Sequence, residues 1–538
     1  MNPEESRLSS DWITSSVYMW IDIRSYRDSN GDGIGDIQGL ISKLDYLEEI
    51  GVRVILTTAL HPTDFAYAGT MMTKFCDIDP RLGTLEDFDR LIVEAHRRGI
   101  RFVACWAPYS THPDHPYFQA SRNPNHPKHE EYCDYYVWTD DPNTHWFRGL
   151  GHWELDNMRK QYYHAIWQTQ KKIDARWCPE TNPYSERMRK ENERVIRFWL
   201  ERGLDGFWID CGSDGGTFRT EEDRVAFSQE INRIIHSYPN KLSIAEGGGL
   251  RIERTIYRLG YDQFWCHQGM RVPVIQTIFG GRTLVDGPHP GREDHGIHDV
   301  LIGFYNVPKG NQCCTLGWEL WLSPSHKEPL DLRDPLNVVR VKQLFALATT
   351  LPLAPIFFMG MECGFRTDVS IDPPETYFVP MMWVSEEPNF GFTTGKPFIK
   401  ANPYNYPENM AVKDQLADED SILNSFKKLV NLRKDNPALQ ANEPIGDSYA
   451  RIPSQDDLKY YAFVRSCTKT GQKVLVIFNL QDSAEKISLN FERTRHKVYG
   501  KFTMIDLCDG EPVAPLSSNI YSLQLPAHGF RILEMKSA

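Results

Sequence analysis

A short loop with the sequence DSNGDGIGD, residues 28–36, concentrates side-chain oxygen atoms. Its oxygen-bearing residues include Asp28, Asn30, Asp32 and Asp36, separated mostly by glycines. Calcium prefers several oxygen ligands in an adaptable shell, and this alternation lets one loop surround one ion. The spacing therefore predicts a calcium site, with a solvated acidic turn as the alternative interpretation.

Short apolar strand patterns and amphipathic helix patterns alternate along the chain on both sides of this loop. This alternation is typical of a parallel sheet covered by helices. The expected strands are residues 17–19, 52–57, 100–104, 204–210, 242–246, 300–306 and 355–359. The expected helices are residues 40–49, 85–98, 186–202, 221–236, 336–350 and 421–434. The number of units favours an α/β fold with a closed (β/α)8 TIM barrel over an open sheet.

Two regions depart from this alternation. Residues 110–172 are rich in His, Pro, Asn, Tyr and Trp, and we expect a subdomain inserted after strand 3, on the barrel face where sites are built. From residue 437 onward the chain changes to short alternating strands, which predict an all-β C-terminal domain. The expected domains are the barrel, residues 1–109 and 173–436; the inserted subdomain, residues 110–172; and a C-terminal β-sandwich, residues 437–538.

The bulk composition excludes some classes of function. Of the 538 residues 41% are hydrophobic and 25% charged, as in ordinary globular proteins, and the net charge of -12 argues against nucleic-acid binding. No apolar run is long enough to predict a membrane span. The polar first residues show no signal-peptide pattern, which favours a cytoplasmic location. The 11 cysteines form no CxxC pair, so we expect reduced thiols.

Several long segments resemble one enzyme family. They include RDSNGDGIGDIQGLISKLDYLEEIGV, DIDPRLGTLEDFDRLIVEAHRRGI, RFWLERGLDGFWID and NFGFTTGKPF. The chain resembles glycoside hydrolase family 13, the α-amylase family, and within it the oligo-1,6-glucosidase, sucrose-isomerase and α-glucosidase branch. The likeness runs from about residue 16 to residue 535. It implies the same barrel, insertion and C-terminal domain, a structural role for the calcium ion, and a further ligand in the backbone carbonyl of Ile34.

The resemblance also implies a pair of catalytic carboxylates. Enzymes of this family retain anomeric configuration, since one carboxylate attacks the sugar carbon while the other protonates the leaving oxygen and later activates water. The nucleophile ends the fourth strand in a G-F-R-x-D pattern, which aligns here with GFWID, residues 206–210. The acid/base ends the fifth strand, here IAEG, residues 244–247. Asp210 is thus the expected nucleophile and Glu246 the expected acid/base.

Other family positions are occupied by different residues. Trp208 stands where the family has an arginine that pairs with the nucleophile, so the pKa of Asp210 is expected to rise if the site is dry. The third-strand motif D-x-x-x-N-H aligns with residues 105–110, so Cys105 replaces the supporting Asp and Ser110 the sugar-binding His.

Two further motifs are altered. The second-strand G-Y-D motif aligns with GTM and loses its stacking Tyr to Thr70, with Met71 after it. The seventh-strand H-D pair aligns with Tyr305 and Asn306, although an H-D pair at residues 298–299 precedes that strand. The resulting pocket is expected to be more aromatic and apolar than a glucose site. Its expected lining comprises Trp208, Tyr109, Tyr305, Asn306, Trp106 and Cys105.

Three functions stay open. The first is a repurposed enzyme that uses Asp210 and Glu246 on a small-molecule ligand less hydroxylated than glucose, such as a non-glucose glycoside or one with an aromatic aglycone. The second is a catalytically silent binding or partner module, similar to the extracellular domains of amino-acid-transporter heavy chains but without their membrane span. The third is a working α-glucosidase or glucosyl isomerase whose lost contacts are supplied by loops.

Overall fold

The central part of the chain is a closed barrel of eight parallel strands. In barrel order these strands are β1 (Tyr18–Ile21), β12 (Ala354–Phe358), β11 (Cys313–Thr315), β10 (Gln263–Cys266), β9 (Leu242–Gly247), β8 (Gly206–Ile209), β3 (Arg101–Trp106) and β2 (Val54–Thr57). The expected TIM barrel is thereby confirmed.

The computed structural model describes residues 12–58, 60–63, 70–144, 151–169, 176–210, 216–247, 258–266, 274, 277–278, 297, 301, 313–315, 331–365, 379–399, 408–452, 459–494 and 500–538.

Two barrel strands differ from the sequence prediction. The sixth strand, β10, was not predicted, and the seventh is β11 rather than residues 300–306. Within that segment Leu301 is described, and it is helical and buried. A short apolar run suits a buried strand and a buried helix equally well, which explains the wrong assignment.

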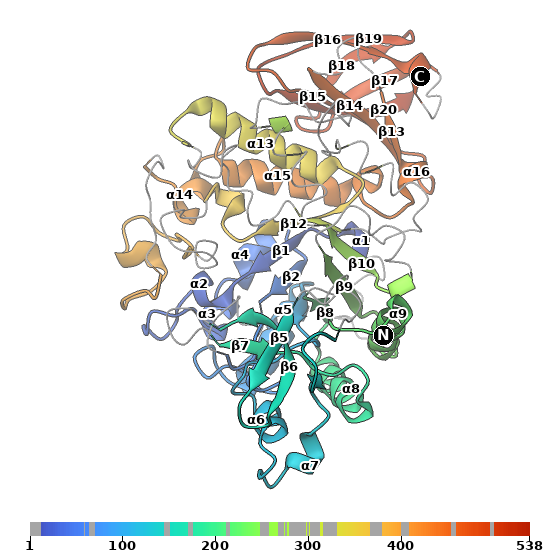
Figure 1. The fold of residues 1–538 in the computed structure, drawn as a ribbon. Coiled ribbons are helices and arrows are strands. Elements are labelled where there is room, and N and C mark those ends of the chain that lie inside the picture. Colours follow the sequence, from blue (N-terminus) through green and yellow to red (C-terminus); the bar gives the residue numbers. More distant parts are fainter. Residues whose placement is uncertain are drawn as a thin grey trace.

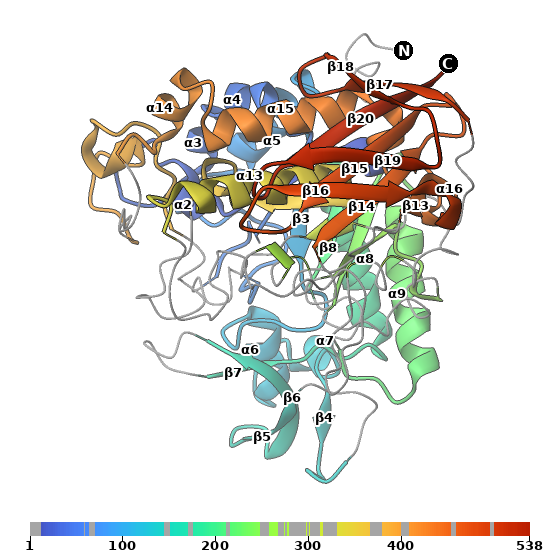
Figure 2. The same cartoon turned by 90° about the horizontal axis from the view of Figure 1, so that it is seen from above.

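Helices cover the outside of the barrel, as Figures 1 and 2 show. They include α4 (Leu44–Glu49), α5 (Leu85–Arg97), α8 (Glu186–Glu201), α9 (Glu221–Ile235), α13 (Pro335–Thr350) and α15 (Ile422–Asp435). Helix α5 shows why these segments form helices that pack on the barrel. Thr84 caps its first turn in a capping box, and one face of the helix is a buried apolar stripe formed by Phe88, Leu91, Ile92 and Ala95. No helix in the described ranges is long and apolar enough to cross a membrane.

The inserted subdomain follows β3 and lies at the opposite end of the barrel from the C-terminal domain (Figures 1 and 2). It contains α6 (Pro116–Arg122), α7 (His129–Tyr132), β4 (Trp138–Thr139), β5 (His152–Asp156), β6 (Gln161–Gln168) and β7 (Trp177–Pro179). Because β7 pairs with β6, the sheet continues beyond residue 172, where the insertion was expected to end.

The C-terminal domain consists of two antiparallel sheets with a separate apolar core between them. One sheet is ordered β13 (Tyr449–Arg451), β14 (Tyr460–Ser466), β15 (Lys473–Asn479), β20 (Phe530–Ser537), β17 (Phe502–Asp506) and β18 (Pro512–Leu516); the other pairs β16 (Glu485–Asn490) with β19 (Ile520–Leu525). The buried Arg465 ties this domain to the barrel, since its guanidinium donates to carbonyls of Thr350, Leu439 and Gln440.

Candidate functional site

Asp210 directly follows strand β8, and Glu246 is the last residue but one of the neighbouring strand β9. These strands pair in parallel register up to Ile209 and Ala245, so the next residues, Asp210 and Glu246, lie side by side. Glu246 is in turn paired with Trp265 on β10. The carboxyl ends of parallel strands meet at one face of a barrel, where the residues of a catalytic site are usually found.

Both carboxylates are on the strand faces that line the barrel interior. Side chains alternate along a strand, so Asp210 shares a face with Trp208. The ring of Trp208 contacts that of Trp20 on β1, with centroids 5.9 Å apart, although β1 and β8 are not neighbours in the barrel. Because that contact crosses the barrel interior, the side chain of Trp208 points inward. Asp210 and its register partner Glu246 therefore also point inward, at the carboxyl end of the barrel.

Below the carboxylates the barrel is filled by an aromatic floor, made of Trp20, Trp208, Trp265 and Phe358. Trp208 lies 4.4 Å from Trp265, and Trp20 lies 4.5 Å from Phe358, between ring centroids. All four side chains are buried. The indole N–H of Trp208 has no hydrogen-bond acceptor among the described residues, so it does not replace the arginine by donating to Asp210.

The other members of the floor were not predicted to lie at the site. Trp265 belongs to the unpredicted strand β10, Trp20 lies one residue beyond the strand expected at residues 17–19, and Phe358 lies within the strand expected at residues 355–359. Trp265 is the register partner of Glu246, and Trp20 joins the floor through ring contacts with Trp208 and Trp265 across the barrel, which no sequence pattern indicates. The expected rise in the pKa of Asp210 stays a prediction.

Cys105 lies close to both carboxylates. Its strand position is paired with Trp208, so it also faces the interior. Burial raises the pKa of the Cys105 thiol well above its usual value, and the negative charges of Asp210 and Glu246 raise it further. The thiol is therefore neutral, and it occupies the family's supporting-Asp position without adding a third negative charge.

Two other replacements contact one another. The hydroxyl of Ser110 donates to the sulfur of Met71 at 3.6 Å, and both residues are buried. Ser110 aligns with the family's sugar-binding His, and Met71 aligns with its second-strand motif. One weak hydrogen bond to sulfur therefore links these two positions.

A small hollow lies beside Asp210. Its described lining residues are Ala107, Tyr109, Ser110, Ile166, Trp167, Asp210 and Gly216. Tyr109 packs against Phe227 at 5.7 Å, and burial raises the pKa of its hydroxyl well above the usual value. Tyr109 therefore lies in the wall of this hollow, together with Asp210.

Trp167, which sequence reasoning missed, brings the inserted subdomain to the same hollow. Its φ of 50° is in the left-handed region, which is costly for a bulky residue, and the register of β6 against β7 shifts between Ile166 and Gln168. Strained backbone of this kind persists where the surrounding structure fixes it and is concentrated at functional sites.

Of the remaining expected lining residues, only Trp106 is described, and it lies away from the carboxylates. Trp106 is next to Cys105 on β3 and faces the opposite side, where its ring packs against Phe207 at 5.7 Å. It therefore lies between the barrel and its helices and is not grouped with the carboxylates. Tyr305 and Asn306 lie outside the described residues.

The loop of residues 28–36 is closed by its own hydrogen bonds. Asp28 accepts from the backbone N–H groups of Asn30, Gly31 and Gly33 and from the hydroxyl of Thr393. Burial alone would raise the pKa of Asp28, but the hydrogen bonds from Thr393, Gly31 and Gly33 outweigh it and lower the pKa. Asp28 is therefore held as a carboxylate.

The other expected calcium ligands also accept hydrogen bonds in this loop. Asn30 accepts from the N–H of Asp32, Asp32 from that of Ile34, and Asp36 from Ser29. Among the described residues no three His, Cys, Asp or Glu side chains gather as a metal site. A metal ion in this loop would therefore need amide and carbonyl oxygens as well as carboxylates, which are ligands that calcium accepts.

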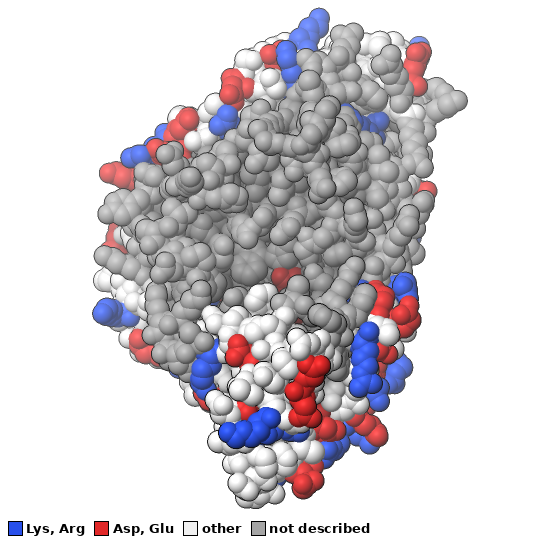
Figure 3. Space-filling view, viewed as in Figure 1, with Lys and Arg blue, Asp and Glu red and all other residues white. Residues whose placement is uncertain are grey.

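The surface of the inserted subdomain, at the lower end of Figure 3, carries charges of both signs among uncharged residues. This mixture is typical of a solvated surface and gives no indication of a nucleic-acid interface.

The architecture defines a glycosidase-like barrel protein: paired acids at the carboxyl ends of the fourth and fifth strands, an insertion after the third, and a C-terminal β domain. The family model of the α-amylase catalytic domain matches residues 21–244 and 361–442, and that of the maltogenic amylase C-terminal domain matches residues 451–532. The chain belongs to the α-amylase family.

Relatives of known activity are similar over most of the chain. An oligo-1,6-glucosidase of Bacillus cereus is 28% identical, over 88% of this chain and 91% of its own length. The trehalose synthase/amylase TreS of Mycobacterium tuberculosis is 25% identical, over 96% of this chain and 89% of its own. The structure of the trehalulose synthase MutB from Pseudomonas mesoacidophila has the same fold, with a TM-score of 0.73, 22% identity, and coverage of 98% of this chain and 99% of its own.

Proposed function

We propose that this protein is a retaining glycoside-processing enzyme whose ligand is less hydroxylated than glucose at the ring that contacts the aromatic floor. The observation that carries the proposal is the pair Asp210 and Glu246, side by side at the barrel's carboxyl end above that floor. The relatives named oligo-1,6-glucosidase and trehalose synthase/amylase support a glycosidic ligand.

The placement of the two acids suits double displacement. Neighbouring strands are about 4.8 Å apart, and carboxyl groups about 5 Å apart are typical of retaining enzymes. Asp210 attacks the anomeric carbon while Glu246 gives its proton to the departing oxygen, which leaves a glycosyl ester on Asp210. Glu246 then takes a proton from water, whose oxygen attacks the same carbon and releases Asp210.

The aromatic floor supports the restriction on the ligand. Rings pack well against the C–H faces of a sugar or against another ring, but they offer few partners for hydroxyl groups. Trp208, Cys105 and Ser110 replace an arginine, an aspartate and a histidine of the family pattern, so charged contacts to ring hydroxyls are lost. A deoxygenated ring or an aromatic leaving group fits such a surface better than glucose does.

Hydrolysis of a panel of nitrophenyl glycosides and their deoxy analogues would test the proposal. We expect turnover of a deoxy or non-glucose member that is lost in Asp210→Asn and in Glu246→Gln, but kept in Glu186→Gln, a control at an exposed position. Turnover that survives in Asp210→Asn would contradict the proposed nucleophile. Efficient turnover of the plain α-glucoside would contradict the restriction on the ligand and favour an ordinary α-glucosidase.

A catalytically silent module is the second candidate. The observation in its favour is the packing of Trp208 between Trp20 and Trp265, in the place where the family keeps a cation beside the nucleophile. Glycosides that bind with the same affinity to the native chain and to Asp210→Asn, without turnover in either, would favour this reading.

We also propose that the loop of residues 28–36 binds one calcium ion. Carboxylate, amide and carbonyl oxygens of Asp28, Asn30, Asp32, Ile34 and Asp36 would hold it. The donor chemistry fits, because these are hard oxygen ligands and Asp28 is kept ionised. A bound ion would brace this loop against the segment that contains Thr393, which already bonds to Asp28.

A further inference from the structure

The hollow beside Asp210 is bounded by three segments that are far apart in the sequence. One follows β3, one is part of β6 in the inserted subdomain, and one follows β8. Asp210 supplies the single charge among the described lining residues, and Glu246 is not one of them. A ring that enters this hollow therefore meets the expected nucleophile in otherwise uncharged surroundings.

The side of the reaction that this hollow serves follows from the chemistry of displacement. A nucleophile attacks the anomeric carbon from the face opposite the leaving group, while the acid stands beside the leaving oxygen. Since the described lining contains Asp210 and not Glu246, the hollow lies on the nucleophile's side. The ring that it holds is the one transferred to Asp210.

Ile166 and Trp167 are neighbours on β6, yet both line this hollow. Regular alternation along a strand would place them on opposite faces of the sheet. The alternation is broken here, because the register of β6 against β7 shifts between Ile166 and Gln168, and Trp167 has a φ of 50°. Such an irregularity re-aims a side chain, and the left-handed backbone is unfavourable for a bulky residue. Strained backbone thus brings the Trp167 indole to Asp210.

Trp167 is also the aromatic residue of this wall that keeps some exposure. Its side chain is partly exposed, whereas Ile166 and Tyr109 are buried. An indole offers a flat surface on which the C–H face of a sugar ring packs well. Trp167 therefore has the exposure and the chemistry of a stacking group beside the nucleophile.

A stacking group at this hollow has a counterpart in the family pattern, but at another position. The family's stacking tyrosine aligns with Thr70, which is followed by Met71. The sulfur of Met71 accepts a hydrogen bond from Ser110, and Ser110 lines the hollow. The second-strand motif thus adjoins the hollow without providing a ring, and Trp167 supplies one from the inserted subdomain.

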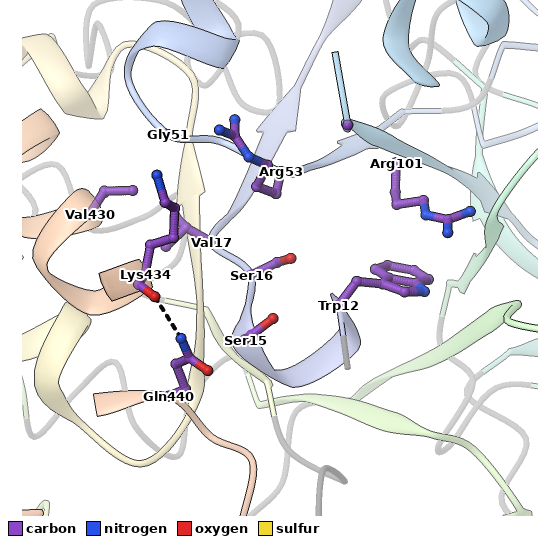
Figure 4. A pocket seen from close by; sticks show the side chains of 11 residues that line it. Trp12, Ser15, Ser16, Val17, Gly51, Arg53, Arg101, Val430, Lys434 and Gln440 are labelled. Carbon is purple, nitrogen blue, oxygen red and sulfur yellow. Dashed lines mark hydrogen bonds between the residues drawn. The ribbon is translucent and has the colours of Figure 1, made fainter. Parts of the chain in front are cut away.

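A second hollow lies at the other end of the barrel and does not compete for this ring. Figure 4 shows its lining, which includes Val17, Arg53 and Arg101 at the starts of β1, β2 and β3. Its described lining residues include no carboxylate, so it offers no nucleophile for glycosyl transfer. The transferred ring is therefore assigned to the hollow beside Asp210.

On the basis of the proposed glycoside reaction, we propose that Trp167 is a specificity-determining residue that stacks on the transferred ring. Its indole favours a ring with a hydroxyl-poor face, such as that of a deoxy sugar, because an aromatic surface offers few partners for hydroxyl groups. The strained backbone is retained because it places the indole beside Asp210.

Calorimetric titration with phenyl α-thioglucoside and its 6-deoxy analogue tests the role of Trp167 without turnover, since the sulfur resists cleavage. We expect the native chain to bind the deoxy analogue more tightly. Trp167→Asn should weaken that binding about tenfold or more, whereas Trp167→Phe keeps a ring and most of the affinity. The matched control is Trp138→Asn, because the Trp138 ring stacks on Phe118 elsewhere in the inserted subdomain. Unchanged affinity in Trp167→Asn, a preference for the parent thioglucoside, or no saturable binding at millimolar ligand would overturn the proposal.

Melting temperatures separate a stacking role from a packing role. Asparagine tolerates left-handed backbone, so Trp167→Asn should melt no lower than the native chain, while Trp138→Asn should melt lower. A decrease in Trp167→Asn as large as that in Trp138→Asn would show that the ring is kept for packing. Weakened thioglycoside binding in Trp167→Asn, without turnover of any nitrophenyl glycoside by the native chain, would support Trp167 and contradict the proposed reaction.

Discussion

The indole rings of Trp208 and Trp265, which belong to the strands on either side of β9, lie 4.4 Å apart inside the barrel. In the family pattern the position of Trp208 holds a cation that pairs with the nucleophile. Here the same position contributes to packing, and the aromatic floor replaces a charged contact with an apolar one.

Replacement of Trp208 by alanine should measure the packing contribution of the floor. Loss of a large buried aromatic side chain typically lowers the free energy of unfolding by about 3–5 kcal/mol. Urea unfolding, followed by circular dichroism, would give this value, with Trp177→Ala on the partly exposed strand β7 as the matched control. A change below about 1 kcal/mol in Trp208→Ala would show that the floor is not tightly packed.

The barrel was predictable from sequence because its strands and helices alternate with clear apolar periods. Residues such as Phe88 and Leu91 mark the buried face of α5 without any structure. Strand β11 was misplaced because Cys313–Thr315 is too short to show a period. Local pattern cannot reveal a three-residue strand that forms only when its neighbours β10 and β12 are present.

The acids of the site were predictable, whereas much of their surroundings was not. Asp210 and Glu246 follow strand patterns that the family motif identifies. Trp167 comes from a different subdomain, and Trp20 reaches the site across the barrel, so their places depend on tertiary packing. Trp106 and Cys105 are neighbours in sequence but face opposite sides, and the alternation along β3 separates them.

Glu362 should make the protein less stable as the pH rises. Burial raises its pKa to about 7, with opposing hydrogen bonds that include one from Tyr46. Because the folded form holds the proton more tightly than the unfolded chain, the stabilisation is complete below about pH 4.5 and is lost as the pH passes 7. The shift corresponds to a loss on the order of 3 kcal/mol.

The variant Glu362→Gln keeps an acceptor for Tyr46 but cannot ionise. Urea unfolding at pH 5 and pH 8 should show that the variant loses less stability over this range than the native chain. Glu186→Gln, at an exposed position, serves as the control. Identical pH dependence in the native chain and Glu362→Gln would exclude this carboxyl as the source.

Calcium should raise the melting temperature of the native chain. A ligand that binds only the folded state stabilises it by about 2.7 kcal/mol at a free concentration one hundred times its Kd. Differential scanning calorimetry with calcium, and then with excess chelator, should show a reversible increase that is absent in Asp28→Asn. Asp45→Asn, at an exposed carboxylate, should keep the increase. An equal response in both variants would place the calcium effect outside this loop.

Replacement of Glu246 by glutamine should separate the two steps of the proposed reaction. A dinitrophenyl glycoside needs no proton for its leaving group, so Asp210 can still attack, but water is no longer activated by Glu246. General acid–base assistance typically contributes about 100- to 10,000-fold, so steady-state turnover should fall within that range. Intact-protein mass spectrometry should then detect a glycosyl adduct.

The position of that adduct decides the mechanism. Peptide mapping should locate it on Asp210, and added azide, a small nucleophile that needs no base, should release it as a glycosyl azide. The double variant Asp210→Asn/Glu246→Gln should form no adduct, because its first step lacks a nucleophile. An adduct on any other residue would mean that these neighbouring strand ends do not act as the pair their geometry suggests, and hydrolysis without an adduct would favour direct attack by water.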